Sequence, residues 1–545
     1  MKGFLVAVML AATFAVQAAA PPRGDDRLRE LVVFPEMNLN FNFGMSPEGI
    51  QWVINENVNL TEKISQLREE AKQQPGDIKR ILNLAYALDK NDETNESQAC
   101  YQKAEQLCRK KLATSPQDGL TMIDLGAALQ GLIKKEEAES VYRRATLVSS
   151  NEWRCWASLG NYLAEDYGSL FANEPRGQEI FQALMSSQED SGYRPPAEAL
   201  KQLEAKANEA ARCYERAVAL APGEPELYLQ RAGYACSSNM VDCLIRHYRD
   251  KEAIDSKTWL LAFWSQKTIA DLQKAAELSP KNYQYISLAT YYVWYSAILR
   301  LNGANSAILR LDGANTAADA LPDTTRDYVH GAMARLEQLS EDPDKKIAAG
   351  ALEHHGMLSI FLKNTSAAQT DLRRAVALDP ARESSWDMLL VALAESGSPE
   401  EKVAVCEARL KARNSAWNHL LLARAFQYLK KWDKAGEEIE AALKLEPDNL
   451  VAQLELAALA LTQSNDPDAM AKAGTHLAQF EKIFEKAPYS KESESEWRCL
   501  NLNLAIYDAL TGAPGSKDMA KACLETVLKR HPDDQDAKAI AGALN

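Results

Sequence analysis

Apolar and polar positions along most of this chain follow the period of paired amphipathic helices. The 34 residues of 416–449 show the pattern most clearly, because residues three or four apart share one face of an α-helix. The apolar face positions are Leu422, Ala423, Phe426, Ala435, Ile439 and Ala442. Pro447 follows them, and a proline cannot continue a helix. The stretch therefore predicts two antiparallel helices that end at the proline.

This pattern resembles the tetratricopeptide repeat (TPR), a helix hairpin of 34 residues. Numbered from Ala416, the small and apolar residues fall at repeat positions 7, 8, 11, 20, 24 and 27, and the proline falls at position 32. One hairpin cannot bury its own apolar face, so hairpins of this kind stack. The resemblance implies an all-α fold, an α-solenoid (right-handed superhelix) of stacked hairpins. It also implies that the function is binding.

Prolines mark the ends of predicted second helices over most of the chain. They are Pro75, Pro116, Pro222, Pro280, Pro380, Pro447, Pro488 and Pro532. Asp, Asn, Ser or Glu follows several of them, and these residues cap the next helix. The unit from Gly119 repeats the pattern closely, with Ala138, Tyr142 and Ala145 at positions 20, 24 and 27. Repeats are therefore expected over most of the chain.

The regularity of the pattern divides the sequence into segments. From the N-terminus, the expected segments are a signal peptide at 1–18, a non-repeat extension, partly extended or disordered, at 19–60, N-terminal repeats at 61–222, irregular aromatic-rich repeats at 223–345, C-terminal repeats at 346–532 and a capping helix at 533–545. An insertion is expected at 166–205, and 296–315 is a tandem copy of one decapeptide. Residues 39–43 alternate apolar and polar side chains, as a short strand does.

The first residues predict export. Lys2 precedes a 13-residue apolar run, 4–16, which is too short to span a bilayer and is followed by small residues. We expect a Sec-type signal peptide cleaved after Ala18, and a periplasmic or secreted protein. No later stretch approaches 18 apolar residues, so no membrane span is expected in the mature chain.

Composition narrows the choice of partner. The formal net charge of −14 argues against a nucleic-acid binder, because phosphate binding needs a basic face. The nine cysteines are scattered, and we expect most of them to be small buried apolar residues. The pairs Cys236–Cys243 and Cys499–Cys523 are candidates for a disulfide.

Motifs that carry chemistry are missing from the sequence. It contains no GxxxxGK[ST], GxGxxG, HExxH, GxSxG or CxxC pattern. His354 and His355 are adjacent, and neighbours on a helix point about 100° apart, which makes a poor metal chelate. We therefore expect no catalytic residue, no metal and no cofactor, and a protein that is not an enzyme.

The resemblance to TPR proteins implies a partner-binding groove, lined by first-helix positions 2, 5, 9, 12 and 13. The residues that this register assigns to the groove, and that we choose as candidates, are Tyr291, Trp294, Tyr295, Met357, Phe361, Trp417, Arg424 and Tyr428. Asn161 takes position 9 of an earlier unit. The segment 259–295 contains nine aromatic residues. We expect them either to fill an irregular core or to form a binding strip on the surface. Both interpretations of this cluster stay open.

The function expected from these features is that of a non-enzymatic exported scaffold. It would bind a partner protein or an extended peptide in its concave groove. One alternative is a carbohydrate- or cell-wall-binding protein that uses the aromatic-rich middle. Another is an enzyme subunit whose site lies in the irregular segments. The sequence does not identify the partner.

Overall fold

The structure is a computed structural model that describes residues 28, 32, 60–91, 93–172, 197–250, 265–302, 322–394, 397–463, 466–484, 494–511 and 513–544. These residues form 22 helices and no strand, which confirms the predicted all-α fold. They belong to two compact units, whose helices lie before and after the boundary between Leu378 and Asp379. The predicted signal peptide and the alternating stretch 39–43 lie outside the described residues.

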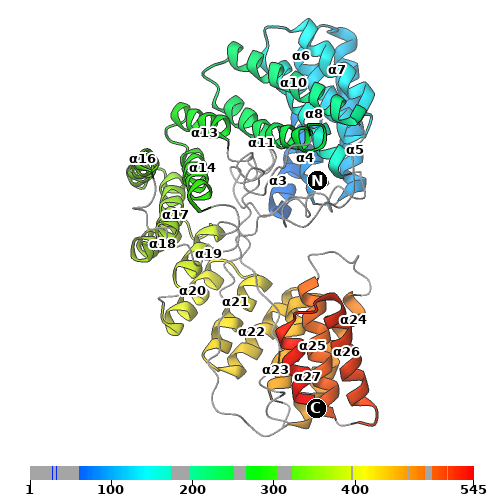
Figure 1. Ribbon diagram of the computed structural model, residues 1–545, viewed down its shortest axis with the longest axis vertical. Coiled ribbons are helices and arrows are strands. Elements are labelled where there is room, and N and C mark those ends of the chain that lie inside the picture. The colour runs from blue at the N-terminus through cyan, green and yellow to red at the C-terminus, as the bar shows by residue number, and fades with distance from the viewer. Residues whose placement is uncertain are drawn as a thin grey trace. The chain divides into compact units, whose positions relative to one another are not determined.

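The first unit contains the helices of the N-terminal and middle repeats (Figure 1). They are α3 (Leu60–Gln73), α4 (Ile78–Lys90), α5 (Thr94–Thr114), α6 (Gly119–Gly131), α7 (Lys135–Val148), α8 (Trp153–Ala172), α10 (Ala197–Leu220), α11 (Pro225–Tyr248), α13 (Gln266–Leu278), α14 (Tyr283–Asn302), α16 (Asp323–Leu339), α17 (Lys345–Phe361) and α18 (Thr365–Leu378). The described ends of the predicted insertion continue α8 and α10. The first residues of the duplicated decapeptide lengthen α14.

The second unit contains the remaining helices. They are α19 (Glu383–Ala392), α20 (Pro399–Ala412), α21 (Ala416–Tyr428), α22 (Trp432–Leu445), α23 (Leu450–Thr462), α24 (Pro467–Phe484), α25 (Glu494–Thr511), α26 (Ser516–Arg530) and α27 (Gln535–Leu544). Consecutive helices pair as hairpins, and α27 packs on both α25 and α26 (Figure 1).

Small residues bring the two helices of a hairpin into close contact. A Cβ atom at Gly126 would lie 2.6 Å from the ring of Tyr142, and one at Gly160 would lie 3.2 Å from the ring of Tyr214. These pairs join repeat positions 8 and 24 in the hairpins α6–α7 and α8–α10. The same contact across the insertion, between Gly160 and Tyr214, shows that α10 is the second helix of the repeat that α8 begins.

A recurring hydrogen bond joins each of several repeats to the end of the one before. The side chain at position 4 donates to the backbone carbonyl at position 32 of the preceding repeat. The pairs are Trp156 with Ser150 at 2.9 Å, Tyr228 with Pro222 at 3.0 Å, Trp386 with Pro380 at 3.0 Å and Gln453 with Pro447 at 3.4 Å. Each acceptor is a backbone carbonyl in the turn two residues after the second helix ends, and the bond satisfies it.

The turn between the two helices of a hairpin uses a left-handed backbone residue. Ile133, Lys363 and Lys430 have φ angles of 61°, 58° and 56°, and each stands at repeat position 15. A non-glycine residue in this conformation carries strain of about 1–3 kcal/mol. Ile133 is branched at Cβ and 72% exposed, so the strain at this residue is not offset by burial.

We expect Ile133→Gly to stabilise the first unit by about 1 kcal/mol. Glycine removes the left-handed strain at the turn, and this gain exceeds its entropy cost of about 0.5–1 kcal/mol. Urea unfolding followed by circular dichroism measures the change. Ile133→Val keeps the branched side chain and should leave the midpoint unchanged. A lower midpoint for the glycine variant would contradict the assignment of strain to this turn.

Candidate functional site

The structure describes the side chains of five of the eight candidate residues, and three of these five lie at the surface, all on α21. Trp417 and Arg424 are partly exposed, and Tyr428 is 48% exposed. They occupy repeat positions 2, 9 and 13, which lie on one side of the helix. The helix is held by its other side, where Leu422, Ala423 and Phe426 are buried in the core of the second unit.

The two other candidates with described side chains, Tyr291 and Met357, are buried. Tyr291 is 5% exposed and belongs to the core of the first unit, and Met357 is buried as well. The register expected both on an open face. The cause is the packing of α14, which contacts α13, α16 and α17 together. The side chains of Trp294, Tyr295 and Phe361 lie outside the described residues.

Arg424 is fixed by a buried carboxylate on the next repeat. Its guanidinium donates to Oε1 of Glu455 on α23, and Gln427 donates through Nε2 to Oε2 of the same residue at 2.7 Å. Glu455 is almost fully buried, whereas the Arg424 side chain is 25% exposed. Glu455 therefore orients the guanidinium, and the Arg424 side chain stays partly accessible at the surface.

Burial raises the pKa of Glu455, while Arg424 and the amide of Gln427 act in the opposite direction. Gln427 is itself 7% exposed, and its Oε1 atom accepts no hydrogen bond from any described residue. A buried acceptor of this kind costs free energy unless a donor reaches it. We call Arg424, Gln427, Tyr428 and Glu455 the α21–α23 polar face.

Lys402 borders this polar face from the preceding hairpin. Its ammonium lies 5.4 Å from the ring centroid of Tyr428 and donates to the backbone oxygen of Ala394 at 2.9 Å. Burial lowers the pKa of Lys402. The contact places a cation on one side of the Tyr428 ring, and the half-exposed ring keeps surface for another contact.

In the first unit, too, polar side chains at the same repeat positions link successive repeats. Asn161 on α8 donates to Gln230 on α11 at 3.5 Å, and it accepts a hydrogen bond from the hydroxyl of Tyr214. Gln230 and Tyr285 both donate to Glu226, each at 3.4 Å. Asn161 and Arg424 both stand at position 9, and Gln230 and Glu455 both stand at position 6. A polar pair from position 9 to position 6 thus recurs in both units.

Sequence reasoning missed the position 6 partners. The groove register of the repeat includes position 9, so it selected Arg424 and noted Asn161, but it does not include position 6. Glu455 lies in the run LVAQLELAALALT, where it is the only charged residue. A single carboxylate in an otherwise apolar helix is a signal that could have found it, because buried charges need partners.

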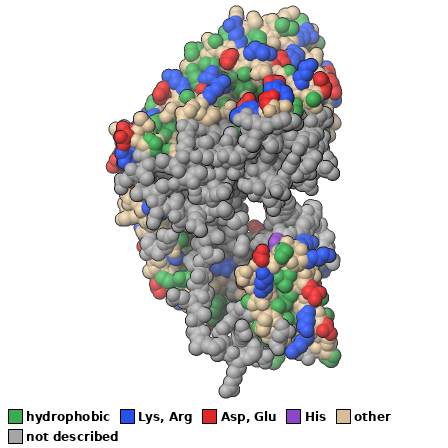
Figure 2. All heavy atoms as spheres, viewed as in Figure 1, with side chains coloured by type: hydrophobic (Ala, Val, Ile, Leu, Met, Phe, Trp, Pro, Cys, Tyr) green, Lys and Arg blue, Asp and Glu red, His purple; other side chains and the backbone are tan. Residues whose placement is uncertain are grey.

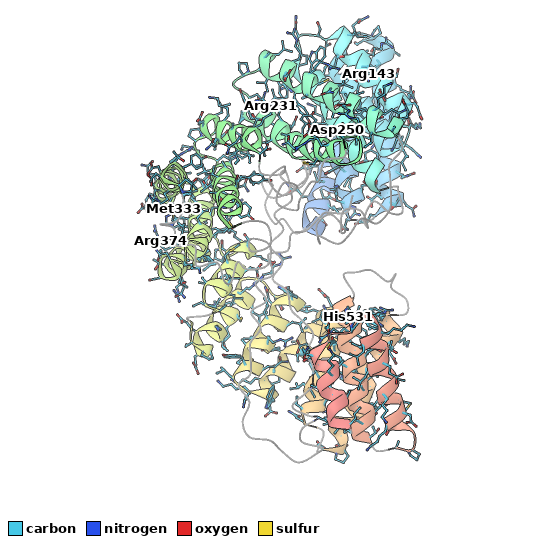
Figure 3. All side chains as sticks on the ribbon, viewed as in Figure 1. Arg143, Arg231, Asp250, Met333, Arg374 and His531 are labelled. Atoms are coloured by element: carbon cyan, nitrogen blue, oxygen red, sulfur yellow. The ribbon has the colours of Figure 1, made fainter. Side chains whose placement is uncertain are left out.

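Other charged residues pair within or between helices. Arg231 on α11 binds Asp271 on α13 through two hydrogen bonds of 2.6 and 2.9 Å, and Arg143 on α7 binds Glu209 on α10. Figure 3 labels the two arginines. Basic and acidic side chains are interspersed on the described surface in view (Figure 2). These pairs join neighbouring helices and are not grouped as a reactive site would group them.

Sites for chemistry are not apparent in the part of the chain that the structure describes. No group of three His, Cys, Asp or Glu side chains there could hold a metal ion. An open hollow of about 450 Å³ lies on the turn between α13 and α14, lined by residues 279–284, and no histidine, cysteine or carboxylate lines it. No described helix is long and apolar enough to cross a membrane.

The described cysteines are thiols. None of the eight, Cys499 and Cys523 included, is in a disulfide, and six of them are buried. Burial raises the pKa of Cys155 and of Cys523 to about 11, which makes these thiols poor nucleophiles. The candidate disulfide Cys499–Cys523 is therefore not formed in the structure. Cys236 lies outside the residues whose side chains are described.

Comparisons with known proteins give structural similarity only. No family model matches the chain, and no curated protein matches it. Yeast Tom70 is 14% identical, with 90% of this chain and 95% of that one covered and a TM-score of 0.34. The Cut9–Hcn1 structure of the APC/C is 16% identical, with 92% of each chain covered and a TM-score of 0.30.

A third similar structure is the C-terminal part of a TPR repeat-containing protein from Cytophaga hutchinsonii. It is 13% identical, it covers 63% of this chain and 98% of its own, and its TM-score is 0.31. Identities and scores of this size say nothing about the partners of this chain. The chain's own contacts, between positions 8 and 24 and between positions 4 and 32, show stacked helix hairpins.

Proposed function

We propose that this protein is an exported, non-enzymatic scaffold that binds an extended segment of a partner protein across the α21–α23 polar face. The observation that carries this proposal is the arrangement of Arg424. Its guanidinium is held by a buried carboxylate while the side chain as a whole is still 25% exposed, so it is oriented before any partner arrives. A preorganised group loses little conformational entropy on binding.

The neighbouring side chains fit a polypeptide partner. Tyr428 offers a half-exposed ring, and tyrosine and arginine are enriched among the residues that dominate protein interfaces. Export rests on the predicted signal peptide of residues 1–18.

The carbohydrate-binding alternative finds less support. Sugar rings stack on exposed aromatic faces, whereas Tyr283, Tyr285, Tyr291 and Tyr292 of the aromatic-rich middle are all buried. The alternative therefore depends on the other five aromatic residues of the cluster, whose side chains lie outside the described residues: Trp259, Phe263, Trp264, Trp294 and Tyr295. No arrangement of acid, base and nucleophile among the described side chains favours an enzyme subunit.

Photo-crosslinking in the producing cell tests the proposed face. A photoreactive phenylalanine analogue replaces Tyr428 in one variant and Leu147 in a control. Leu147 lies on α7 and is 81% exposed, so it reports contacts of an exposed position away from α21. We expect a discrete crosslinked protein from position 428 only. Equal crosslinking at both positions, or none at 428, would overturn the proposal.

Mass spectrometry of the crosslinked species gives the bound segment, which can then be synthesised. We expect Tyr428→Ala to weaken binding of that peptide by about tenfold or more, because a central interface ring contributes at least about 1–2 kcal/mol. Isothermal titration calorimetry measures the affinity. Leu147→Ala should leave it unchanged.

A further inference from the structure

Two neighbouring first helices of the first unit, α4 and α6, expose large apolar side chains. Tyr86 on α4 is 44% exposed, and Leu120 on α6 is 36% exposed. They stand at positions 9 and 2 of their repeats, and the two helices are in contact. The ammonium of Lys90 lies 5.1 Å from the ring centroid of Tyr86. The junction of α4 and α6 therefore has apolar surface that the rest of the unit leaves open.

An aspartate without a partner stands beside this apolar surface. Asp124 lies one helical turn after Leu120, on the same side of α6. Its side chain is partly buried, yet neither carboxylate oxygen is fully buried. Neither oxygen forms a hydrogen bond or an ion pair with a described residue. A carboxylate that loses hydration without gaining a donor costs free energy, so a cation supplied from outside would be favoured at this point.

The nearby lysines do not neutralise Asp124 by direct contact. Burial raises the pKa of Asp124, while Lys79 and Lys111 act in the opposite direction. The ammonium of Lys111 is engaged elsewhere, in an ion pair of 3.1 Å with Asp118. Lys79 is exposed on α4, and no ion pair joins it to Asp124. The carboxylate of Asp124 is therefore the charge at this junction that is left to be paired.

The repeat register shows what this junction lacks. Asp124 stands at position 6, where Glu455 receives the guanidinium of Arg424 from position 9 of the preceding repeat. At the α4–α6 junction, position 9 carries the ring of Tyr86, and no hydrogen bond joins this side chain to Asp124. The junction thus has the acceptor of the recurring polar pair without a donor from the preceding repeat.

We propose that the α4–α6 face, formed by Tyr86, Leu120 and Asp124, binds a lysine or arginine side chain of an extended partner segment. The cation of that side chain pairs with Asp124 and takes the place of the missing donor. Its aliphatic stem packs on Leu120 and on the exposed part of the Tyr86 ring, as the stems of basic residues do on apolar surface. The face is separate from the α21–α23 polar face and does not depend on the function proposed there.

Peptide selection tests this preference without a known partner. A phage-displayed library of 12-residue peptides is selected on the full-length protein and depleted on the Asp124→Lys protein. Depletion removes peptides that bind any other surface, because those surfaces are unchanged in the variant. We expect the remaining peptides to share a lysine or an arginine at one aligned position. No remaining peptide, or remaining peptides without a shared basic residue, would overturn the proposal.

One selected peptide, synthesised with a fluorophore, gives the affinity by fluorescence anisotropy. We expect Asp124→Asn to weaken binding at least tenfold. Replacing the shared basic residue of the peptide by norleucine should weaken binding to the wild-type protein as much, and should have no further effect on the Asp124→Asn protein. Asp433→Asn is the matched control, because it removes an exposed carboxylate on α22. Independent losses from the two changes, or equal losses in the control, would overturn the pairing.

Two further variants locate the peptide. Lys79→Ala removes a cation that acts on Asp124, so we expect binding to tighten at least twofold. Tyr428→Ala alters the α21–α23 polar face and should leave the affinity unchanged. Weaker binding to Lys79→Ala, or a loss in Tyr428→Ala, would overturn the assignment to the α4–α6 face. The circular dichroism of Asp124→Asn should match that of the wild-type protein, since the carboxylate bonds to no described residue.

Discussion

Arg424→Leu is expected to destabilise the second unit by about 3–5 kcal/mol. The substitution removes the cation beside Glu455 and leaves a carboxylate without its charge partner in the core. Breaking one half of a buried ion pair has a cost of this size, because the remaining charge is neither solvated nor neutralised. Hydrogen exchange of the α21 and α23 amides measures the free energy of opening at the site itself.

The pH dependence of this variant follows from the position of the carboxyl. The pKa of a glutamate in an unfolded chain is about 4.3, and burial raises the pKa of Glu455 in the folded protein. Losing Arg424 removes a group that lowers this pKa, so the folded value rises further. The folded variant then binds a proton more tightly than the unfolded chain does. Its destabilisation should therefore shrink as the pH falls from 7 towards about 4.3.

The double variant Arg424→Leu/Glu455→Leu is the control. Replacing both charges by apolar side chains removes the uncompensated carboxylate, and such replacements are often neutral. We expect recovery of most of the loss. The remaining deficit should be about 1 kcal/mol, because Gln427 loses its acceptor. An Arg424→Leu protein as stable as the wild type at pH 7 would contradict the role of the pair.

Tyr291→Ala is expected to destabilise the first unit by about 3–5 kcal/mol. The ring is 5% exposed in the core that α14 shares with its neighbours, and it lies 6.3 Å from the ring of Tyr292. Truncating a buried aromatic side chain loses its transfer free energy and leaves a cavity. Urea unfolding measures the loss.

Tyr428→Ala makes the matched comparison for this prediction. The same substitution at a half-exposed tyrosine leaves no enclosed cavity, so the loss of stability should be below about 1 kcal/mol. The two variants thus separate a core ring from a surface ring. If Tyr291→Ala were as stable as Tyr428→Ala, the assignment of the Tyr291 ring to the core would be wrong. The aromatic-rich middle would then again be a candidate binding surface.

The fold could be predicted from the sequence because small residues and prolines recur at a fixed spacing. The pair Gly126 and Tyr142 indicates close helix packing without coordinates, since only a glycine lets that ring approach the helix. Proline positions add the helix ends. These signals are local to one hairpin, and they are repeated often enough to set the register of the chain.

The burial of particular side chains could not be predicted in the same way. The repeat register assigns Tyr291 and Tyr428 to one side of their helices, but it does not count the neighbours of each helix. The helix that carries Tyr291 is enclosed by three others, whereas the side of α21 that carries Tyr428 is open. Glu455 was missed for a related reason, because periodicity treats a charged residue as solvent-exposed unless a partner is known.

The polar pairs between positions 9 and 6 also restrict how such a chain can lengthen. Adding or deleting a whole repeat between α8 and α11 would place Asn161 beside a residue other than Gln230, and the same change between α21 and α23 would separate Arg424 from Glu455. Growth inside a repeat leaves these pairs intact. The predicted insertion at 166–205 lies between the two helices of one repeat, α8 and α10, so it lengthens the chain without changing the order of paired repeats. A gene that grows in this way keeps its repeats in a fixed, non-interchangeable sequence.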